Sequence, residues 1–369
     1  MNAPRFGHGL IVGKFYPPHS GHLGVVERAA TECDRVSVVV AAASNELIPL
    51  GDRVDWLGWA AAIWPHVNVI GTMDDHPIDY DDPVVWDAHE AVFREAVTEI
   101  AGGVDVDAVF TGEDYGDELA HRFGATHIRF RRLAGGVSGT RLRADLAGNW
   151  HDLVEPARVA LARRIVVLGA ESTGTTTLAR ELAASLAAAY VPEYGRTYSA
   201  AKLAAARQTA YAAEAPRPWM DGLEWTSDEF ELIAARQTQA IDSACLPHSV
   251  VVADTDALAT SVWHDRYIGG PHPAALTLAT ANRPDTYILT SPEGVPFAQD
   301  GLRDGETVRD EMHQQFVLAL AESRLNWVAV SGSREERLRL ALRACAPVLQ
   351  PGRWFSPATE QPTATSESS

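Results

Sequence analysis

The sequence has few cysteines, no long apolar run and no excess of positive charge. Its three cysteines, Cys33, Cys245 and Cys345, are far apart and outside any metal-ligand spacing, which indicates reduced, buried thiols rather than disulfides or zinc ligands. No apolar stretch is long enough to cross a bilayer without a charge or a break, and the N-terminal residues do not read as a signal peptide. We therefore expect a cytoplasmic protein with no membrane partner.

The balance of charge is strongly acidic. A formal net charge of -18 argues against broad, non-specific nucleic-acid binding, which needs a basic surface. An anionic substrate must then be held by a few local cations and backbone N–H groups. We expect small-molecule partners and no nucleic acid, and the sequence leaves a homo-oligomer open.

The chain is long for a single core. Its 369 residues suggest two domains. In both halves β-rich runs alternate with amphipathic helices, which predicts two α/β domains, each a doubly wound parallel sheet with helices on its faces. We expect domains at 1–158 and 159–350, and a disordered tail rich in Pro, Ser and Thr at 351–369.

The first predicted strand leads into GKFYPPHSGH, which ends at His22. If a helix begins near His19, the two histidines share one face at a helix N-terminus, where free N–H groups favour anions. Gly21 lets the backbone approach a ligand closely, and Lys14 can meet a phosphate as a point charge. The pattern favours a polyphosphate site, although two histidines in an ordinary surface loop are the alternative.

A second anion motif, GGVSGTRLR, closes the same domain. Ser138 and Thr140 lie at an expected helix start, and Arg141 and Arg143 follow closely. N-cap groups combined with guanidinium groups suit the binding of oxygen anions.

The stretch VVLGAESTGTTTLAREL, at 166–182, has the outline of a P-loop. Gly169 and Gly174 have the spacing of the motif, follow an apolar strand and precede a helical pattern. Backbone N–H groups of the loop, which includes Ser172, are expected to cradle phosphates. Thr176 is expected to direct its hydroxyl to Mg²⁺.

Thr175 stands where a P-loop has lysine, so a working site needs another cation. Arg303 and Arg309 lie in a polar, glycine-flanked segment that reads as a mobile lid, and Arg196 follows a strand end. A lid arginine is a suitable donor to a transferring phosphoryl group.

Acidic residues follow the predicted strands of the second domain. Carboxylates at the C-terminal end of a parallel strand lie at the ligand crevice. We expect Asp254 to help hold Mg²⁺, and Glu193 or Asp256 to accept the proton of a substrate hydroxyl. The alternative is that these acids cap turns or helices.

Trp263 and Tyr267 are four residues apart and share one helical face. They either clamp a flat ring or belong to the core.

Taken in order, the motifs resemble the bifunctional nicotinamide-nucleotide adenylyltransferase and ribosylnicotinamide kinase family, over about residues 9–345. The resemblance rests on GKFYPPHSGH, VSGTRLR, GAESTGTTT, PEYGRTY, ADTD and DGLRD, in that order. The first two resemble the HxGH and S-x-T-x-[LI]-R signature of nucleotidyltransferases, in which the histidines and the arginine stabilise charge on the transferring group. The resemblance implies catalytic roles for His19, His22 and Arg141. The family usually keeps the P-loop lysine, and the absence of that lysine puts the second activity in doubt.

The resemblance implies two ATP-dependent reactions. The front domain would join nicotinamide mononucleotide (NMN) to AMP from ATP, and the back domain would phosphorylate nicotinamide riboside, with Mg²⁺ as cofactor. Trp86 is a candidate to stack on the nicotinamide ring, and a core position is its alternative. The helix-turn-helix of some enterobacterial members is not expected, because few residues precede the first strand.

Two alternatives remain open. Because of Thr175, the back domain can be a silent nucleotide sensor that regulates the front domain. The front domain can also take another substrate, such as a different pyridine nucleotide or pantetheine phosphate, and the sequence does not separate amide from acid.

Overall fold

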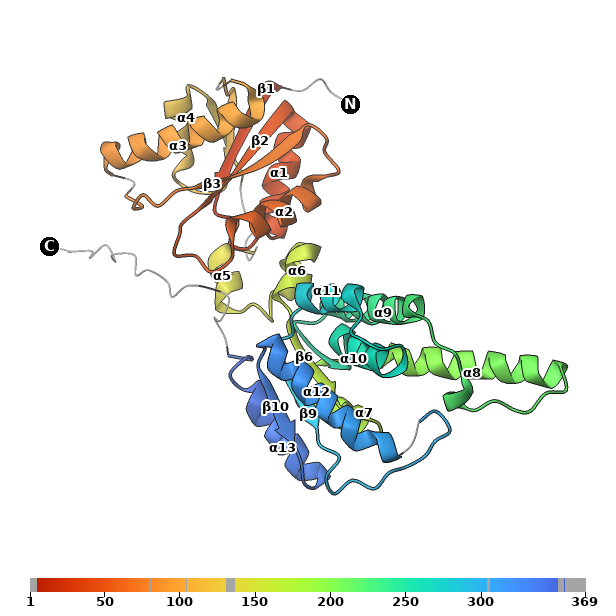
Figure 1. Ribbon diagram of the computed structural model, residues 1–369. Coiled ribbons are helices and arrows are strands. Elements are labelled where there is room, and N and C mark those ends of the chain that lie inside the picture. Colours follow the sequence, from red (N-terminus) through yellow and green to blue (C-terminus); the bar gives the residue numbers. More distant parts are fainter. Residues whose placement is uncertain are drawn as a thin grey trace. The chain divides into compact units, whose positions relative to one another are not determined.

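The protein divides into two compact units, Met1–Leu161 with Pro351–Ser369, and Ala162–Gln350. Each unit is an α/β sandwich around one parallel sheet (Figure 1), which confirms the predicted fold class. The computed structural model describes residues 5–79, 81–103, 105–130, 137–303, 306–350 and 355. The tail expected to be disordered, 351–369, lies outside the described residues except for Phe355.

The first unit contains five strands and six α-helices within its described residues. The strands are β1 (Phe6–Gly13), β2 (Cys33–Ala42), β3 (Val67–Met73), β4 (Ala108–Thr111) and β5 (Thr126–Arg129). The helices are α1 (Ser20–Glu32), α2 (Leu50–Ala61), α3 (Pro83–Ala101), α4 (Gly116–Phe123), α5 (Gly139–Ala144) and α6 (Glu155–Leu161). The sheet order is β3-β2-β1-β4-β5, and every neighbouring pair is parallel.

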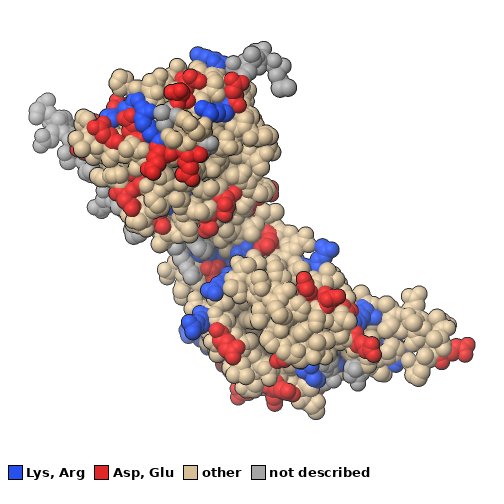
Figure 2. Space-filling model, turned by 45° about the horizontal axis from the view of Figure 1, so that its top comes forward, with Lys and Arg blue, Asp and Glu red and all other residues tan. Residues whose placement is uncertain are grey.

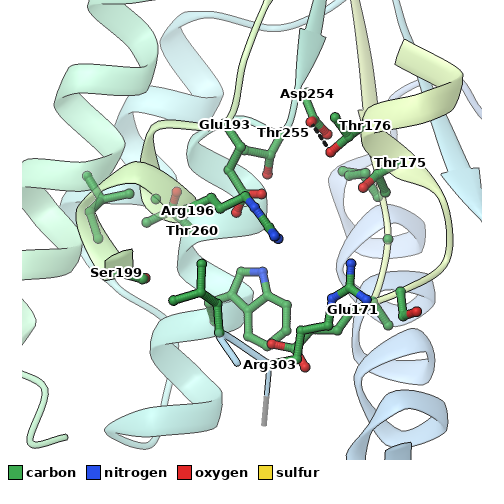
Figure 3. Close-up of a pocket in the computed structure, with 18 of the residues that line it drawn as sticks. Glu171, Thr175, Thr176, Glu193, Arg196, Ser199, Asp254, Thr255, Thr260 and Arg303 are labelled. Atoms are coloured by element: carbon green, nitrogen blue, oxygen red, sulfur yellow. Dashed lines mark hydrogen bonds between the residues drawn. The ribbon is translucent and has the colours of Figure 1, made fainter. Parts of the chain in front are cut away.

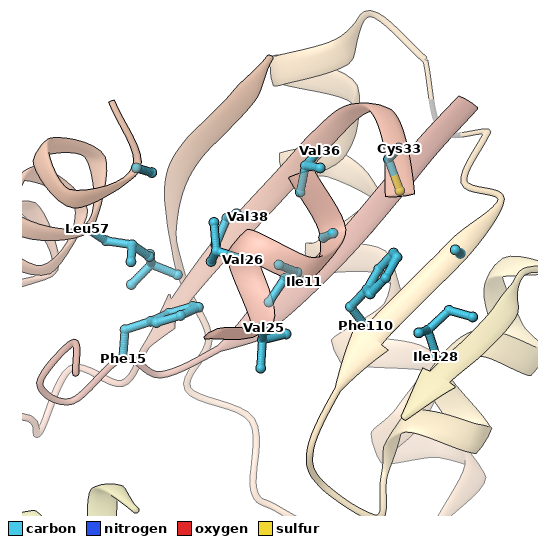
Figure 4. Close-up of a cluster of buried hydrophobic side chains, with 14 residues drawn as sticks. Ile11, Phe15, Val25, Val26, Cys33, Val36, Val38, Leu57, Phe110 and Ile128 are labelled. Carbon is cyan, nitrogen blue, oxygen red and sulfur yellow. The ribbon is translucent and has the colours of Figure 1, made fainter. Parts of the chain in front are cut away.

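Helices cover both faces of this sheet. The central strand β1 points apolar side chains to each face, and each set is buried under helices. Ile11 of β1 packs with Phe15, Val26 and Leu57 in one buried cluster (Figure 4). Its neighbour Leu10 points the other way, into a cluster that α3 and α4 contribute to. A strand buried on both faces is typical of a parallel sheet.

Helix α3 has clear start and stop signals. The Asp82 carboxylate accepts from the Val84 N–H at 2.8 Å, and Pro83 occupies the first turn. Gly102 ends the helix in the left-handed conformation, with a φ of 66°. These signals fix where α3 runs, and therefore where its Trp86 and His89 lie.

The second unit has the same layering. Its strands are β6 (Arg163–Leu168), β7 (Ala189–Val191), β8 (Val250–Asp254), β9 (Thr286–Thr290) and β10 (Trp327–Val330), in the order β10-β9-β6-β8-β7. Its helices are α7 (Thr175–Ser185), α8 (Tyr194–Ala212), α9 (Ser227–Cys245), α10 (Ala257–Tyr267), α11 (Pro273–Ala281), α12 (Arg309–Ser323) and α13 (Arg334–Cys345). All pairs are parallel, so the strands end at one common edge, where ligands bind in such sheets.

The surface and the thiols agree with the composition. Acidic and basic side chains are interspersed over the described residues that Figure 2 shows, without a continuous basic patch on that face. The three cysteines are free and buried, as expected. No helix in the described ranges is long and apolar enough to span a membrane.

Candidate active sites

A cavity of about 500 Å³ opens at the C-terminal edge of the first sheet. It is lined by the end of β1 and the loop that follows, and by parts of α1, α3 and α5. The two anion motifs found in the sequence, which are more than a hundred residues apart, therefore meet at one cavity.

The two histidines of the first motif lie at the start of α1. His19 is the N-cap, and its Nδ1 accepts from the Gly21 N–H at 3.1 Å. The His19 and His22 rings stack with centroids 3.7 Å apart, and Phe15 lies 4.7 Å from the His22 ring. A Cβ at Gly21 would stand 3.0 Å from the His19 ring, so glycine suits this close approach. The arrangement places two imidazoles at the cavity, at the positive end of the α1 dipole.

The second motif forms the start of α5. Ser138 is the N-cap, and its hydroxyl accepts from the Arg141 N–H at 3.2 Å. The Arg143 guanidinium donates to the Tyr16 carbonyl at 3.0 Å and to the Thr140 hydroxyl at 3.3 Å, and burial lowers the pKa of Arg143.

The arginine that lines the cavity is Arg143. Arg141, the residue expected from the sequence to be catalytic, is exposed and does not line the cavity. Residues three apart share a helical face, so Thr140 is matched by Arg143 rather than by its immediate neighbour.

Lys14 lines the same cavity but already has a partner. Its ammonium lies 2.9 Å from the Glu46 carboxylate, and the lysine side chain is 51% exposed. Burial alone would raise the pKa of Glu46, but hydrogen bonds from Lys14 and Arg53 outweigh it and hold the pKa below its usual range. Lys14 therefore stands at the cavity as a cation that one carboxylate holds in place.

Trp86 is buried and lines the cavity. It also belongs to the apolar cluster under α3, and the Arg122 guanidinium lies 5.6 Å from its ring centroid. Both roles considered from the sequence, ring stacking and core packing, remain consistent with this position.

In the second unit, the predicted P-loop joins β6 to α7. Gly174 has a φ of 87°, a conformation that favours glycine, and a Cβ at Gly169 would lie 2.3 Å from the Thr290 hydroxyl. Both glycines of the motif are therefore required by the local geometry. The loop lines a cavity of about 220 Å³.

Two oxygen ligands meet beside the loop (Figure 3). The Thr176 hydroxyl donates to the Asp254 carboxylate at 2.6 Å, and Tyr190 donates to the same oxygen at 3.3 Å. Burial raises the pKa of Asp254, although the hydrogen bonds from Thr176 and Tyr190 oppose the shift. A hydroxyl and a carboxylate in contact form a donor set that suits Mg²⁺.

Glu193 also lines this cavity (Figure 3). Burial, and then the negative charges of Asp254 and Glu171, raise the pKa of Glu193 to about 7, although Arg196 opposes the shift. A carboxyl that titrates near neutral pH can accept a proton from a substrate.

Two of the three candidate cations reach this cavity. Arg196 forms an ion pair with Asp300, and Arg303 lies 3.5 Å from the same carboxylate. Both arginines line the cavity (Figure 3). Arg309 does not line the cavity, and its guanidinium donates to the Val295 carbonyl at 2.9 Å.

Ser172 connects the P-loop to the segment that carries Arg303. Its hydroxyl accepts from the Ala298 N–H at 2.9 Å and lies 3.4 Å from the Pro296 carbonyl. Ser172 therefore belongs to the loop and also holds this segment next to it.

A buried arginine that the sequence did not suggest supports the loop from α13. The Arg337 guanidinium donates to the Thr173 carbonyl at 3.1 Å, and to the carbonyls of Ser291 and Glu293 at 2.9 and 3.0 Å. Burial lowers the pKa of Arg337. It ties the loop to the end of β9 and so fixes the shape of the loop.

Asp256 does not line this cavity, in contrast to the expectation that it accepts a substrate proton. It is the N-cap of α10, where its carboxylate accepts from the Ala259 N–H at 3.1 Å and from the Tyr287 hydroxyl at 2.6 Å. The capping alternative therefore describes its place in the structure.

We expect Asp256→Ala to lower the free energy of unfolding of the second unit by about 2–4 kcal/mol. The variant loses an N-cap, worth about 1 kcal/mol, and leaves the buried Tyr287 hydroxyl unpaired, at about 1–3 kcal/mol. Urea denaturation followed by tryptophan fluorescence measures the effect. Unchanged stability combined with lost turnover would return Asp256 to a catalytic role.

Aromatic side chains form one wall of the second cavity. Trp263 and Tyr267 both line it, with ring centroids 6.3 Å apart. Trp225, which the sequence did not single out, joins them 5.5 Å from Tyr267, and the Lys202 ammonium lies 4.3 Å from the Trp225 centroid. The wall offers flat faces to a ring-shaped ligand.

Comparison with known proteins agrees across both units. An AAA-domain family model matches residues 164–337. The chain is 24% identical over 340 residues to the "Trifunctional NAD biosynthesis/regulator protein NadR" of Escherichia coli K12, which covers 87% of this chain and 78% of that protein, and the same figures hold for the protein of that name from Salmonella typhimurium LT2.

Solved structures show the same fold. A NadR protein in complex with NR matches with a TM-score of 0.64 at 24% identity, and one in complex with NAD and AMP-PNP matches with a TM-score of 0.63 at 23% identity. Each match covers 94% of this chain and 97% of the other. In sequence and in fold, the chain is similar to these NadR proteins over most of its length.

Proposed function

We propose that the first unit transfers AMP from ATP to NMN, forming NAD and pyrophosphate, and that the second unit uses ATP to phosphorylate the 5′-hydroxyl of nicotinamide riboside. The description of the relatives as NAD biosynthesis proteins supports this pair of reactions. The ligands of the similar structures, NR, NAD and AMP-PNP, support it as well. The free, buried cysteines agree with a cytoplasmic location.

The observation that carries the first activity is the stacked pair His19 and His22, which shares a cavity with Arg143. In the reaction, a phosphate oxygen of NMN attacks the α-phosphorus of ATP, and the bond to pyrophosphate breaks. Negative charge grows on the transferring and leaving oxygens, and N–H donors aimed at them lower the barrier. Equal amounts of NAD and pyrophosphate from Mg²⁺-ATP and NMN are the expected products, and pyrophosphate without NAD would refute the assigned acceptor.

We expect Arg143→Ala to lower the turnover of this reaction by about 10²-fold, because it removes one charged donor from the cavity. Arg141→Ala is the matched control, since Arg141 is exposed on the same helix and does not line the cavity. Rates of NAD formation by the two variants at saturating ATP and NMN provide the comparison. A larger loss in Arg141→Ala than in Arg143→Ala would reverse the assignment.

The second activity rests on Glu193 and on the Thr176–Asp254 pair at the P-loop. These oxygens fit Mg²⁺, which would neutralise the charge of the ATP phosphates. The 5′-oxygen of the nucleoside would attack the γ-phosphorus of ATP while the bond to ADP breaks, and Glu193 would take the proton of the 5′-hydroxyl. The aromatic wall of Trp225, Trp263 and Tyr267 would hold the base of the nucleoside.

Because Thr175 replaces the lysine, a cavity arginine must stabilise the transferring phosphoryl group, and we assign this role to Arg303. Arg303→Ala is expected to lower kinase turnover by about 10²-fold. Arg309→Ala is the control, because its guanidinium is bound to the Val295 carbonyl outside the cavity. Single-turnover phosphorylation of nicotinamide riboside measures both variants, and equal rates in the two would remove Arg303 from the mechanism.

A silent nucleotide-sensing second unit is the alternative, and Thr175 is the observation that favours it. Against it, the two loop glycines, Thr176 and Asp254 are all retained, and two arginines line the cavity. A decayed site would be expected to lose several of these together. We therefore favour a working kinase.

A further inference from the structure

Two histidines and an aspartate that no motif suggested meet at the wall of the first cavity. Asp74 directly follows β3, His76 comes two residues later, and His89 lies on α3. The Nδ1 atoms of His76 and His89 lie 2.9 and 2.6 Å from the two oxygens of the Asp74 carboxylate. One ligand atom from each residue falls within 4.8 Å of the others.

The second ring nitrogen of His89 determines what its Nδ1 offers. The His89 Nε2 lies 3.0 Å from the Pro77 carbonyl, which only accepts, so Nε2 carries a hydrogen. In a neutral imidazole the Nδ1 then carries a lone pair instead of a hydrogen, and here it lies 2.6 Å from an oxygen of the Asp74 carboxylate. Two electron-rich atoms at this separation are stable only if they share a proton or bind a metal ion.

The same hydrogen bond is the support that metal-binding histidines usually have. A ligating histidine almost always donates its other N–H to a carbonyl or a carboxylate, which fixes the ring and its tautomer. His89 is further held by Phe93, whose ring stacks on it with centroids 6.0 Å apart. The Asp74 backbone N–H donates to the Ala42 carbonyl at 2.8 Å, which anchors the aspartate to β2.

Burial and exposure suit a metal site that opens to the cavity. The Asp74 side chain is 6% exposed and that of His89 is 15% exposed, whereas His76 is 44% exposed. All three residues line the first cavity. Three protein ligands that leave a coordination position toward a cavity are typical of sites where an ion contacts a substrate or water.

We propose that Asp74, His76 and His89 bind one divalent transition-metal ion of the zinc type, with an open position facing the first cavity. Two imidazoles and a carboxylate favour zinc, cobalt or nickel over magnesium, which prefers oxygen ligands. The site differs in its ligands from the oxygen pair of the second unit. The inference does not depend on the proposed reactions, because it rests on the geometry of three side chains.

The test is a titration of the metal-stripped full-length protein with Co²⁺, followed by visible absorption, and then by displacement with Zn²⁺. We expect one equivalent of Co²⁺ to produce d–d bands that Zn²⁺ abolishes. Asp74→Asn and His89→Gln are expected to weaken binding by about 10- to 100-fold. His121→Gln is the matched control, because His121 is an exposed histidine of the same unit outside the cluster, and it should bind as the wild type does.

His76→Gln is the variant least expected to disturb the fold, because His76 is the most exposed of the three residues. Circular dichroism verifies that the variant is folded. It should also weaken Co²⁺ binding, with an unchanged spectrum in the far ultraviolet. If the wild type binds Co²⁺ no more tightly than Asp74→Asn and His89→Gln do, the proposal is overturned, and the cluster is an ion pair in which His89 carries the proton.

Discussion

Replacing His22 by alanine is expected to lower NAD formation from NMN by about 10²- to 10³-fold, through the turnover number more than through the KM for ATP. His22 stacks on His19 at the N-terminus of α1, and both imidazoles line the cavity. The imidazole would act on charge that is greater in the transition state than in bound ATP, so its loss would affect the chemical step most.

Steady-state rates of NAD formation measure this effect, with His121→Ala as the control for removal of an exposed histidine from the same unit. Thermal unfolding of both variants shows whether the fold is retained. A folded His22→Ala protein with the wild-type rate would exclude His22 from catalysis.

The second large effect is expected at Glu193. Glu193→Gln should lower phosphorylation of nicotinamide riboside by about 10²- to 10⁴-fold, because it removes the group that takes the proton from the 5′-hydroxyl. Glutamine keeps the size of the side chain and its ability to accept hydrogen bonds, so ATP binding should change little.

The pH dependence distinguishes a base from a positioning residue. Only the ionised carboxylate accepts a proton, and burial raises the pKa of Glu193 to about 7. The kcat/KM for nicotinamide riboside should therefore rise with pH and level off above about 7 in the wild type. In Glu193→Gln the residual kcat/KM should not show this rise with pH. An unchanged rise in the variant would assign the base to another group.

The architecture could be predicted from the sequence because hydrophobic patterns and motifs agreed. Helix α9 runs from Ser227 to Cys245, and its start is marked by a capping box of Thr226 and Glu229, a signal that can be read from the sequence. Helix α8 was not anticipated, since its alanine-rich stretch has little contrast between apolar and polar faces. The short pair α4 and β5 was also missed, because eight- and four-residue elements give weak periodic signals.

Side-chain placement was less accessible. The spacing S-x-T-x-[LI]-R, counted from Ser138, ends at Arg143, which lines the cavity, so the spacing itself favours Arg143 over the Arg141 expected to be catalytic. Asp254 and Asp256 both follow an apolar run in the sequence, but Asp254 ends β8 whereas Asp256 is the N-cap of α10. Contacts such as that of Arg337 with the P-loop join residues 164 positions apart, so no local pattern predicts them.

The most direct measurement is analysis of the products formed by the purified full-length protein from Mg²⁺-ATP and nicotinamide riboside, beside a parallel reaction started from NMN. We predict NAD in both reactions, with NMN as a transient intermediate and ADP released in the first. NAD from NMN alone, with ATP bound but no nicotinamide riboside phosphorylated, would contradict the account of the second unit and support a nucleotide sensor.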